Sequence, residues 1–288
     1  ILIDTRQGVL PQTRRHSMIC SALGIKKVVI AINKMDLVDY SQETFSRILD
    51  DYTNIASQLQ FNEITVIPMS ALKGDNIIKR SSHMHWYQGP TLLGLLETVD
   101  PRLTRLNQPL RFPVQWVNRP NLDFRGFSGT IESGTVEVGQ SIRVMPSGST
   151  AKIKDIALFE DQLQRAEAGQ AITLTLDTEI DASRGDVIVA SDDPCEVADQ
   201  FELNLVWMDQ APGYIGRSFW LKLGTNQVNA RITDIKHKVN INTFEHLSAT
   251  QLELNDLPVV TIKTDRPVAF ERYRDCAQMG ALIPVSYT

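Results

Sequence analysis

Two short polar segments, each placed at the end of an apolar run, carry the side chains in this sequence that could recognise a ligand. Asn33-Lys34-Met35-Asp36 follows KKVVIAI, and Ser70-Ala71-Leu72 comes just after the run that ends at Pro68. In open α/β sheets, ligands bind outside the carboxyl ends of the strands. The two segments are therefore predicted to face one pocket.

Guanine fits the residue types of this predicted pocket. Its N1–H and 2-amino groups are adjacent donors, and O6 and N7 are acceptors. The Asp36 carboxylate can accept from both donors, at about 1.5–3 kcal/mol for each charge-assisted hydrogen bond. Adenine would leave this carboxylate desolvated and unpaired. The pattern therefore predicts a preference for guanine over adenine on the order of 10⁴ or more.

The other residues of the two segments have supporting roles in this prediction. The Asn33 amide can donate to N7 while its oxygen tethers the facing loop, and the aliphatic stem of Lys34 can cover the base or ribose. Ser70 can hold its loop by bonding Asp36 or the backbone, and the backbone N–H of Ala71 is free to meet O6. The predicted guanine-nucleotide site consists of Asn33, Lys34, Asp36, Ser70, Ala71 and Leu72.

A simpler interpretation of the first segment is a helix N-terminus, because Asn and Asp are good caps. Taken alone, the segment is equally consistent with either interpretation. The second segment, after the next strand, shifts the balance towards guanine binding.

The elements that position these segments are predicted by apolar periodicity. Before residue 101, apolar runs alternate with helical patterns, which is typical of a parallel sheet with crossover helices. The expected strands are residues 1–3, 28–32 and 64–68, and the expected helices are residues 11–23, 42–59 and 91–99.

After residue 101 the helical periodicity stops, and short strands separated by glycine turns take over. Such even spacing favours closed barrels, because closure removes exposed sheet edges. The first series is expected at residues 110–117, 126–133, 135–145, 151–159, 171–177 and 186–190. The second is expected at residues 201–208, 219–223, 230–239, 250–254, 259–263 and 281–285. Trp116, Trp207 and Trp220 alternate with apolar neighbours and are predicted to lie in the barrel cores.

Composition narrows the class of protein. The chain has 288 residues, 42% hydrophobic composition and a net charge of −5, which favours a globular protein and argues against a nucleic-acid partner. No apolar run is long enough to span a bilayer and no signal peptide is recognisable, so no membrane partner and a cytoplasmic location are expected. Three distant cysteines indicate buried free thiols. His83 and His85 lack an evident third ligand, so no metal site is predicted.

The sequence resembles the translation-factor class of GTPases, whose guanine-specificity motifs are Asn-Lys-x-Asp and Ser-Ala-Leu/Lys. Within that class it is similar to the family of large, GTP-hydrolysing subunits of bacterial ATP sulfurylase. The motifs that carry the closer resemblance are residues 13–17, 31–37, 68–76, 112–115, 117–121, 124–127 and 179–186. The resemblance implies an α/β plus all-β fold: a partial P-loop GTPase-type parallel domain (residues 1–104) followed by two translation-factor-like β-barrels (residues 105–194 and 195–288).

The same resemblance implies a function. Subunits of this family hydrolyse GTP to drive formation of adenosine 5′-phosphosulfate from ATP and sulfate by a small catalytic partner subunit, in sulfate assimilation. GTP and that partner subunit are therefore expected, and no catalytic residue is assigned to this chain. Two alternatives remain open: an elongation-factor-like GTPase that carries an RNA, and a nucleotide-free β-barrel interaction module.

One departure from the family affects the expected activity. No Gly-x-x-x-x-Gly-Lys-Ser/Thr phosphate loop occurs in the sequence, and no Asp-x-x-Gly motif lies where it could hold the γ-phosphate side of the site. In the family these motifs precede the strand that begins here at Ile1. We therefore expect an N-terminally truncated chain that is inactive alone, with Mg²⁺ bound only when the N-terminal half is present.

Overall fold

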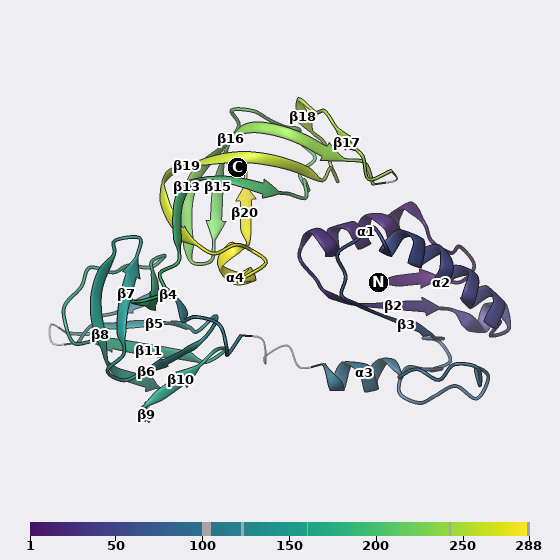
Figure 1. Cartoon of the computed structure of the whole chain (residues 1–288), viewed down its shortest axis with the longest axis horizontal. Coiled ribbons are helices and arrows are strands. Elements are labelled where there is room, and N and C mark those ends of the chain that lie inside the picture. Colours follow the sequence, from purple (N-terminus) through teal and green to yellow (C-terminus); the bar gives the residue numbers. More distant parts are fainter. Residues whose placement is uncertain (100–104, 122–123, 160, 242, 287–288) are drawn as a thin grey trace.

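An α/β part and two β-barrels make up the computed structural model, which describes residues 1–99, 105–121, 124–159, 161–241 and 243–286 (Figure 1). The α/β part is drawn from purple to blue, the first barrel in teal and the second from green to yellow. The predicted boundary between the α/β domain and the first barrel, after residue 104, lies at the edge of a segment outside these described ranges. The exact domain boundaries stay predictions.

Three parallel strands form the sheet of the α/β part, in the order β1 (Leu2–Asp4), β2 (Lys27–Asn33) and β3 (Glu63–Pro68). Asp4 is in register with Asn33, and Ile32 with Pro68. Strand β2 is central, and its last four residues are buried. Because the strands are parallel and in register, their carboxyl ends lie at one edge of the sheet.

Helices α1 (Pro11–Ala22), α2 (Gln42–Ala56) and α3 (Leu92–Thr98) agree closely with the predicted ranges. Ser41 caps α2, since its Oγ accepts from the Thr44 N–H at 3.2 Å, and one stripe of α2 is buried against the sheet. Ser17 of α1 and Tyr52 of α2 share a buried hydrogen bond of 3.2 Å, which joins the two helices.

The first barrel contains all six predicted strand regions. Its closed path runs β11-β5-β4-β12-β7-β8, and β8 returns to β11. The predicted strand at residues 135–145 divides into two at a turn containing Gly139, whose φ of +85° favours glycine. The strands are β4 (Arg111–Asn118), β5 (Gly126–Thr130), β6 (Thr135–Glu137), β7 (Ser141–Met145), β8 (Ser149–Leu158), β9 (Asp161–Leu163), β10 (Arg165–Glu167), β11 (Ala171–Leu176) and β12 (Val187–Ala190).

The second barrel is built on the strand path β13-β19-β16-β15-β20 around a core that includes Trp207, Phe219 and Leu252. Its last strand, expected at residues 281–285, is present and pairs with β15, and a one-turn helix, α4 (Ala277–Gly280), precedes it. The strands are β13 (Glu196–Asn204), β14 (Gly213–Tyr214), β15 (Ser218–Leu223), β16 (Asn226–Val239), β17 (His246–Leu247), β18 (Gln251–Leu252), β19 (Pro258–Phe270) and β20 (Leu282–Val285).

A buried ion-pair network joins the two barrels. Arg111, at the start of β4, has a side chain only 6% exposed and pairs with Glu271 at 2.5 Å and with Asp193 at 3.0 Å. An apolar cluster lies beside it and combines residues of both barrels: Met145, Val187, Val189, Cys195, Ala269, Cys276 and Met279. The barrels therefore share a continuous packed interface.

The prediction that all three strand tryptophans lie in the barrel cores was wrong for Trp116. Trp207 is buried at 5% exposure and Trp220 is partly buried, but Trp116 is 66% exposed. A β-bulge between Val114 and Trp116 inserts Gln115 as an extra residue, so the alternation of inward and outward side chains shifts. Trp116 consequently points outwards.

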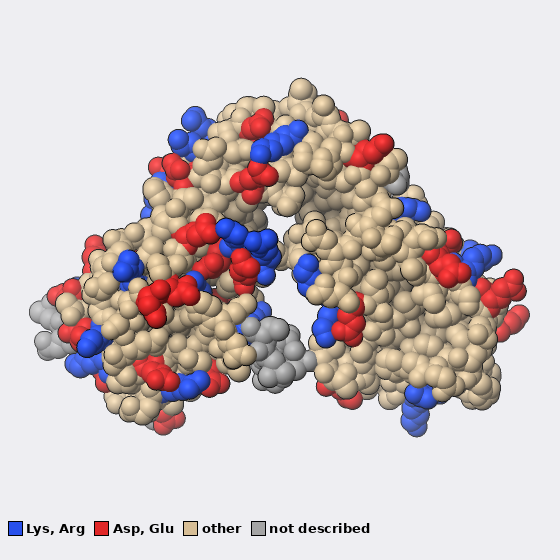
Figure 2. All heavy atoms as spheres, in the orientation of Figure 1, with Lys and Arg blue, Asp and Glu red and all other residues tan. Residues whose placement is uncertain are grey.

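Charged side chains of both signs are intermixed over the face shown in Figure 2, on the α/β part and on both barrels. Two of the three cysteines, Cys195 and Cys276, are buried free thiols as predicted, whereas Cys20 is only partly buried. Within the described ranges, no helix is both long and apolar enough to cross a bilayer.

Candidate guanine-recognition site

The two polar segments predicted from the sequence meet at the carboxyl edge of the three-stranded sheet. Residues 33–40 begin at the last residue of β2, and residues 69–76 follow β3. The Met35 N–H donates to the Met69 carbonyl at 3.2 Å, so the backbones of the two loops are in direct contact. A third segment, residues 4–6 at the end of β1, lies against the first loop through Thr5, whose Oγ1 donates to the Lys34 carbonyl at 2.9 Å.

Asp36 is held from the facing loop by Ser70. The Ser70 hydroxyl, which is fully buried, donates to Asp36 Oδ1 at 2.6 Å. The same hydroxyl oxygen accepts from the Lys73 N–H at 3.1 Å, so its rotamer is fixed on both sides. Asp36 Oδ2 accepts no hydrogen bond from any residue in the described part of the chain. The carboxylate is thus oriented through one oxygen while the other keeps its acceptor capacity.

Asn33 ties the two loops together through its side-chain oxygen. Asn33 Oδ1 accepts from the Lys34 N–H at 2.8 Å and from the Ala71 N–H at 2.9 Å. The expected tether to the neighbouring loop is therefore present. The expectation that the Ala71 N–H is free was wrong, because a buried amide oxygen lies within its reach and takes that donor. Asn33 itself is only 9% exposed.

Lys34 adopts a left-handed backbone conformation, with φ of 69°, at the point where β2 ends. Its ammonium group pairs with Asp4 Oδ2 at 2.8 Å, and Arg6 pairs with the same carboxylate at 2.7 Å. Hydrogen bonds from Arg6, and then from Lys34, hold the pKa of the Asp4 carboxyl well below its ordinary value. The side chain of Lys34 is thereby drawn towards β1.

The sequence interpretation missed Asp4 and Arg6 as part of this site. Both lie about 30 positions before Lys34 in the chain, and nothing in the local pattern of residues 4–6 points to an ion pair. A signal was available, because β1 was predicted to be parallel to β2. Charged residues directly after β1 should then face the segment after β2.

A second layer of contacts supports the loops from behind. Tyr40 donates to Asp75 Oδ2 at 3.0 Å, and Ser81 donates to Asp75 Oδ1 at 2.6 Å. His83 stacks on the Tyr40 ring with a centroid separation of 4.6 Å. Burial, followed by the bond to Asp75, raises the pKa of Tyr40. This layer joins the segment after Asp36 to the segment after Ser70.

The turn after Ser70 has its own backbone bonds. The Ser70 N–H donates to the Asp75 carbonyl at 3.2 Å, and the Gly74 N–H donates to the Ser70 carbonyl at 2.8 Å. Gly74 has a φ of +83°, a conformation that side-chain-bearing residues rarely adopt. Leu72, at the tip, is 84% exposed and contributes no buried contact. The structure therefore brings five of the six predicted residues into one network and leaves Leu72 on its rim.

Taken together, the arrangement presents an acceptor, a donor and a covering stem at one edge of the sheet. It offers the open oxygen of Asp36, the Asn33 amide nitrogen and the methylene chain of Lys34. Within the described ranges, no three His, Cys, Asp or Glu side chains gather closely enough to hold a metal ion. This chemistry suits a neutral heterocycle that donates two adjacent hydrogen bonds.

Three family models match successive parts of the chain. The elongation factor Tu GTP binding domain matches residues 1–105, elongation factor Tu domain 2 matches residues 127–189, and the GTP-eEF1A C-terminal domain-like model matches residues 200–286. Their order along the chain is the order of the α/β part and the two barrels.

Three relatives are similar along nearly the whole chain. Sulfate adenylyltransferase subunit 1 of Laribacter hongkongensis is 46% identical over 99% of this chain and 60% of its own length. The bifunctional enzyme CysN/CysC of Xylella fastidiosa is 48% identical over 98% of this chain and 45% of its own. The bifunctional enzyme NodQ of a Rhizobium species is 47% identical over 98% of this chain and 44% of its own length. The chain thus spans about half the length of these curated relatives.

Solved structures agree on the fold. Sup35 complexed with GDP superimposes with a TM-score of 0.61, and Sup35 complexed with GMPPNP with 0.57. Both are 22% identical and cover 99% of this chain and 74% of their own. At this identity the likeness concerns the fold alone: an α/β part followed by two barrels.

Proposed function

We propose that this chain, a member of the translation-factor class of GTP-binding proteins, supplies the guanine-recognising part of a GTP-driven subunit like sulfate adenylyltransferase subunit 1. In this function, GTP hydrolysis by the whole protein is coupled to formation of adenosine 5′-phosphosulfate from ATP and sulfate. The observation that carries the proposal is the Ser70–Asp36 hydrogen bond of 2.6 Å, because it orients the discriminating carboxylate from the facing loop.

Asp36 is proposed to accept from N1–H and the 2-amino group of guanine. Oδ2 is available in full, and Oδ1 retains a lone pair beyond its bond to Ser70. The Asn33 amide nitrogen would donate to N7. The Lys34 stem would cover the ring while its ammonium stays paired with Asp4.

Ala71 has a more restricted role in the proposal than the sequence suggested. Its N–H already donates to Asn33 Oδ1 at 2.9 Å, so contact with O6 requires a shared, three-centre hydrogen bond or an exchange of acceptor. Leu72, at the exposed tip, can cover the outer edge of the base. These assignments give each of the six residues a distinct contact.

GTP is the proposed nucleotide, and Mg²⁺ would accompany its phosphates in the whole protein. No residue of this chain is assigned to the metal or to a phosphate. The proposed protein partner is the small subunit that carries the adenylyl transfer. The partner proposal rests on the name "subunit 1" of the relative from Laribacter hongkongensis.

Calorimetric titration of the chain with GDP and with ADP tests the nucleotide proposal. We expect saturable binding of GDP and none of ADP at the same concentrations, because only guanine supplies both donors to Asp36. Equal binding of both nucleotides, or of neither, would reject guanine recognition by this chain. If neither GDP nor ADP binds, the result would favour a nucleotide-free interaction module. Co-purification with the small subunit tests the partner proposal separately.

A further inference from the structure

A row of four polar side chains crosses the outer face of the second barrel. Ser218 on β15 is in register with Arg231 on β16, and Arg231 is in register with Lys263 on β19. Lys263 is in turn opposite Gln200 on β13. All four residues are exposed. A hydroxyl, a guanidinium, an ammonium and an amide therefore lie side by side, and no carboxylate interrupts the row.

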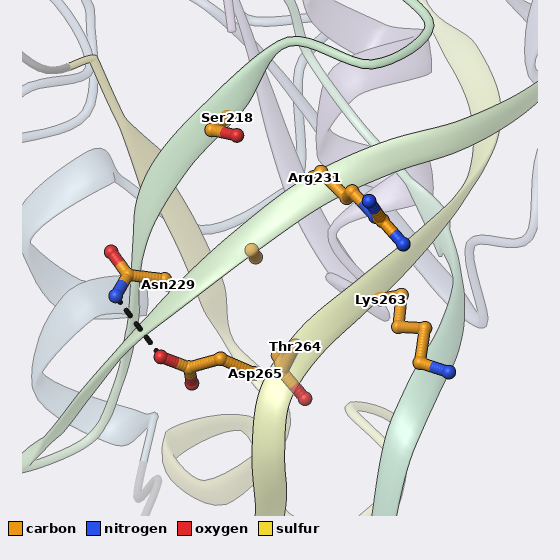
Figure 3. A pocket seen from close by; sticks show the side chains of 7 residues that line it. Ser218, Asn229, Arg231, Lys263, Thr264 and Asp265 are labelled. Carbon is orange, nitrogen blue, oxygen red and sulfur yellow. Dashed lines mark hydrogen bonds between the residues drawn. The ribbon is translucent and has the colours of Figure 1, made fainter.

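The centre of the row is a pair of like charges. Side chains directly opposite each other in an antiparallel pair have Cβ atoms about 4.5–5.5 Å apart, and like charges at this position destabilise the sheet. Figure 3 shows the side chains of Arg231 and Lys263 extending to the same side of the two strands. The arrangement is unfavourable unless a negative group lies between or beside the two cations.

The carboxylates of this chain neutralise the positive charges of Arg231 and Lys263 only in part. Asp199 lies 4.0 Å from the Lys263 ammonium, at the limit of an ion pair, and both side chains are 48% exposed. Asp265 accepts from the Asn229 amide at 3.0 Å and is turned away from the two cations in Figure 3. The Arg231 guanidinium makes no ion pair or hydrogen bond with any residue of the described ranges.

The surface around the pair is hollowed. A depression of about 350 Å³ on the outside of the barrel is lined by Ser218, Arg231 and Lys263 together with Asn229, Ala230, Thr264 and Asp265. Asp265, the one carboxylate in this lining, is bonded to Asn229 at its edge. Thr264 also lines the depression and is 4% exposed, and its hydroxyl donates to the Arg266 carbonyl at 2.8 Å with the Asp199 carbonyl a second acceptor at 3.1 Å. The Thr264 side chain is thus held by internal bonds, whereas Arg231 and Ser218 are exposed on their strands.

We propose that this hollow binds a tetrahedral oxyanion, phosphate or sulfate, between Arg231 and Lys263. The guanidinium can bond two oxygens of such an ion side by side, and the ammonium acts as a compact charge on a third. This site lies on the second barrel and is independent of the guanine-recognition loops.

The test is a titration of the ¹⁵N-labelled chain with sodium phosphate or sodium sulfate, followed by NMR, with sodium chloride keeping the ionic strength constant. The parent chain is expected to show saturable shifts at the amides of Arg231 and Lys263. R231Q and K263Q should each weaken binding by about tenfold, since each removes one charge-assisted contact. K222Q is the matched control, because Lys222 is an exposed cation of β15 that faces Gln227 and Ile283 instead of another cation.

Several outcomes would overturn the proposal: shifts that stay linear with concentration, equal shifts with chloride alone, or equal weakening by K222Q.

A thermal-unfolding series provides the second measurement. Without oxyanion, R231Q and K263Q should unfold at a temperature equal to or above that of the parent, because the like-charge contact is relieved. Low millimolar phosphate should raise the unfolding temperature of the parent more than that of either variant. A parent-like response of both variants to phosphate would count against the site.

Discussion

Replacing Asn33 by alanine is predicted to release the loop after β3 without unfolding the sheet. Asn33 Oδ1 is the acceptor for the backbone N–H groups of Lys34 and Ala71, at 2.8 and 2.9 Å. Alanine offers no acceptor, so both donors lose their partner. Each neutral hydrogen bond of this part-buried kind contributes about 0.5–1.5 kcal/mol. The opening free energy of the loop should therefore fall by about 1.5 kcal/mol.

Native-state hydrogen exchange of the Ala71 amide measures this change directly, because exchange of a loop amide reports local opening. A loss of about 1.4 kcal/mol corresponds to roughly tenfold faster exchange. Asn33→Asp keeps the oxygen and should retain most of the protection. Asn54→Ala is the matched control, since Asn54 lies on the exposed side of α2 and its side chain makes no hydrogen bond with a described residue. Unchanged exchange at Ala71 in Asn33→Ala would refute the tether.

Three further predictions concern the barrels and the ion pairs. Glu271→Gln leaves the buried Arg111 guanidinium with Asp193 as its one carboxylate partner and should cost about 1.5–3 kcal/mol, measured as a lower unfolding temperature of the barrels. An unchanged unfolding temperature would contradict this. Burial raises the pKa of the Cys195 thiol to about 11. Iodoacetamide at pH 8 should therefore modify the partly buried Cys20 before Cys195 in the native chain. Faster modification of Cys195 would refute its burial. The Asp4 carboxyl should show, by NMR titration, a pKa below its ordinary value. The stability that its ion pairs contribute is therefore present above the ordinary carboxyl range and is lost as the pH falls through the lowered pKa. An ordinary pKa of Asp4 would exclude those pairs.

Much of the fold follows from local patterns. Strands β2 and β3 and helix α2 were predicted within a few residues, because their apolar periodicity agrees with their burial. Trp116 was misplaced because alternation cannot reveal a bulge, which is set by pairing with β5.

The candidate site was predictable where its residues directly follow strands. Asn33 and Ser70 come at the ends of β2 and β3, so the parallel sheet alone brings them together. Tyr40, Asp75 and His83 could not be found this way, because their contacts depend on how two loops fold over the sheet edge. The hydrogen bond from Tyr40 to Asp75, for example, joins residues 35 positions apart in the sequence, and no local pattern predicts such a contact.

The central claim is that Asp36 selects guanine, and exchange of its carboxylate tests it most directly. Xanthine carries an oxygen where guanine has the 2-amino group, so an amide at position 36 can donate to that oxygen and still accept from N1–H. Paired titrations of the parent and Asp36→Asn with GDP and with xanthosine diphosphate give the two preferences. The parent should prefer GDP, and Asp36→Asn should reverse the preference, each by about tenfold or more. An unchanged preference for GDP in Asp36→Asn would contradict the account.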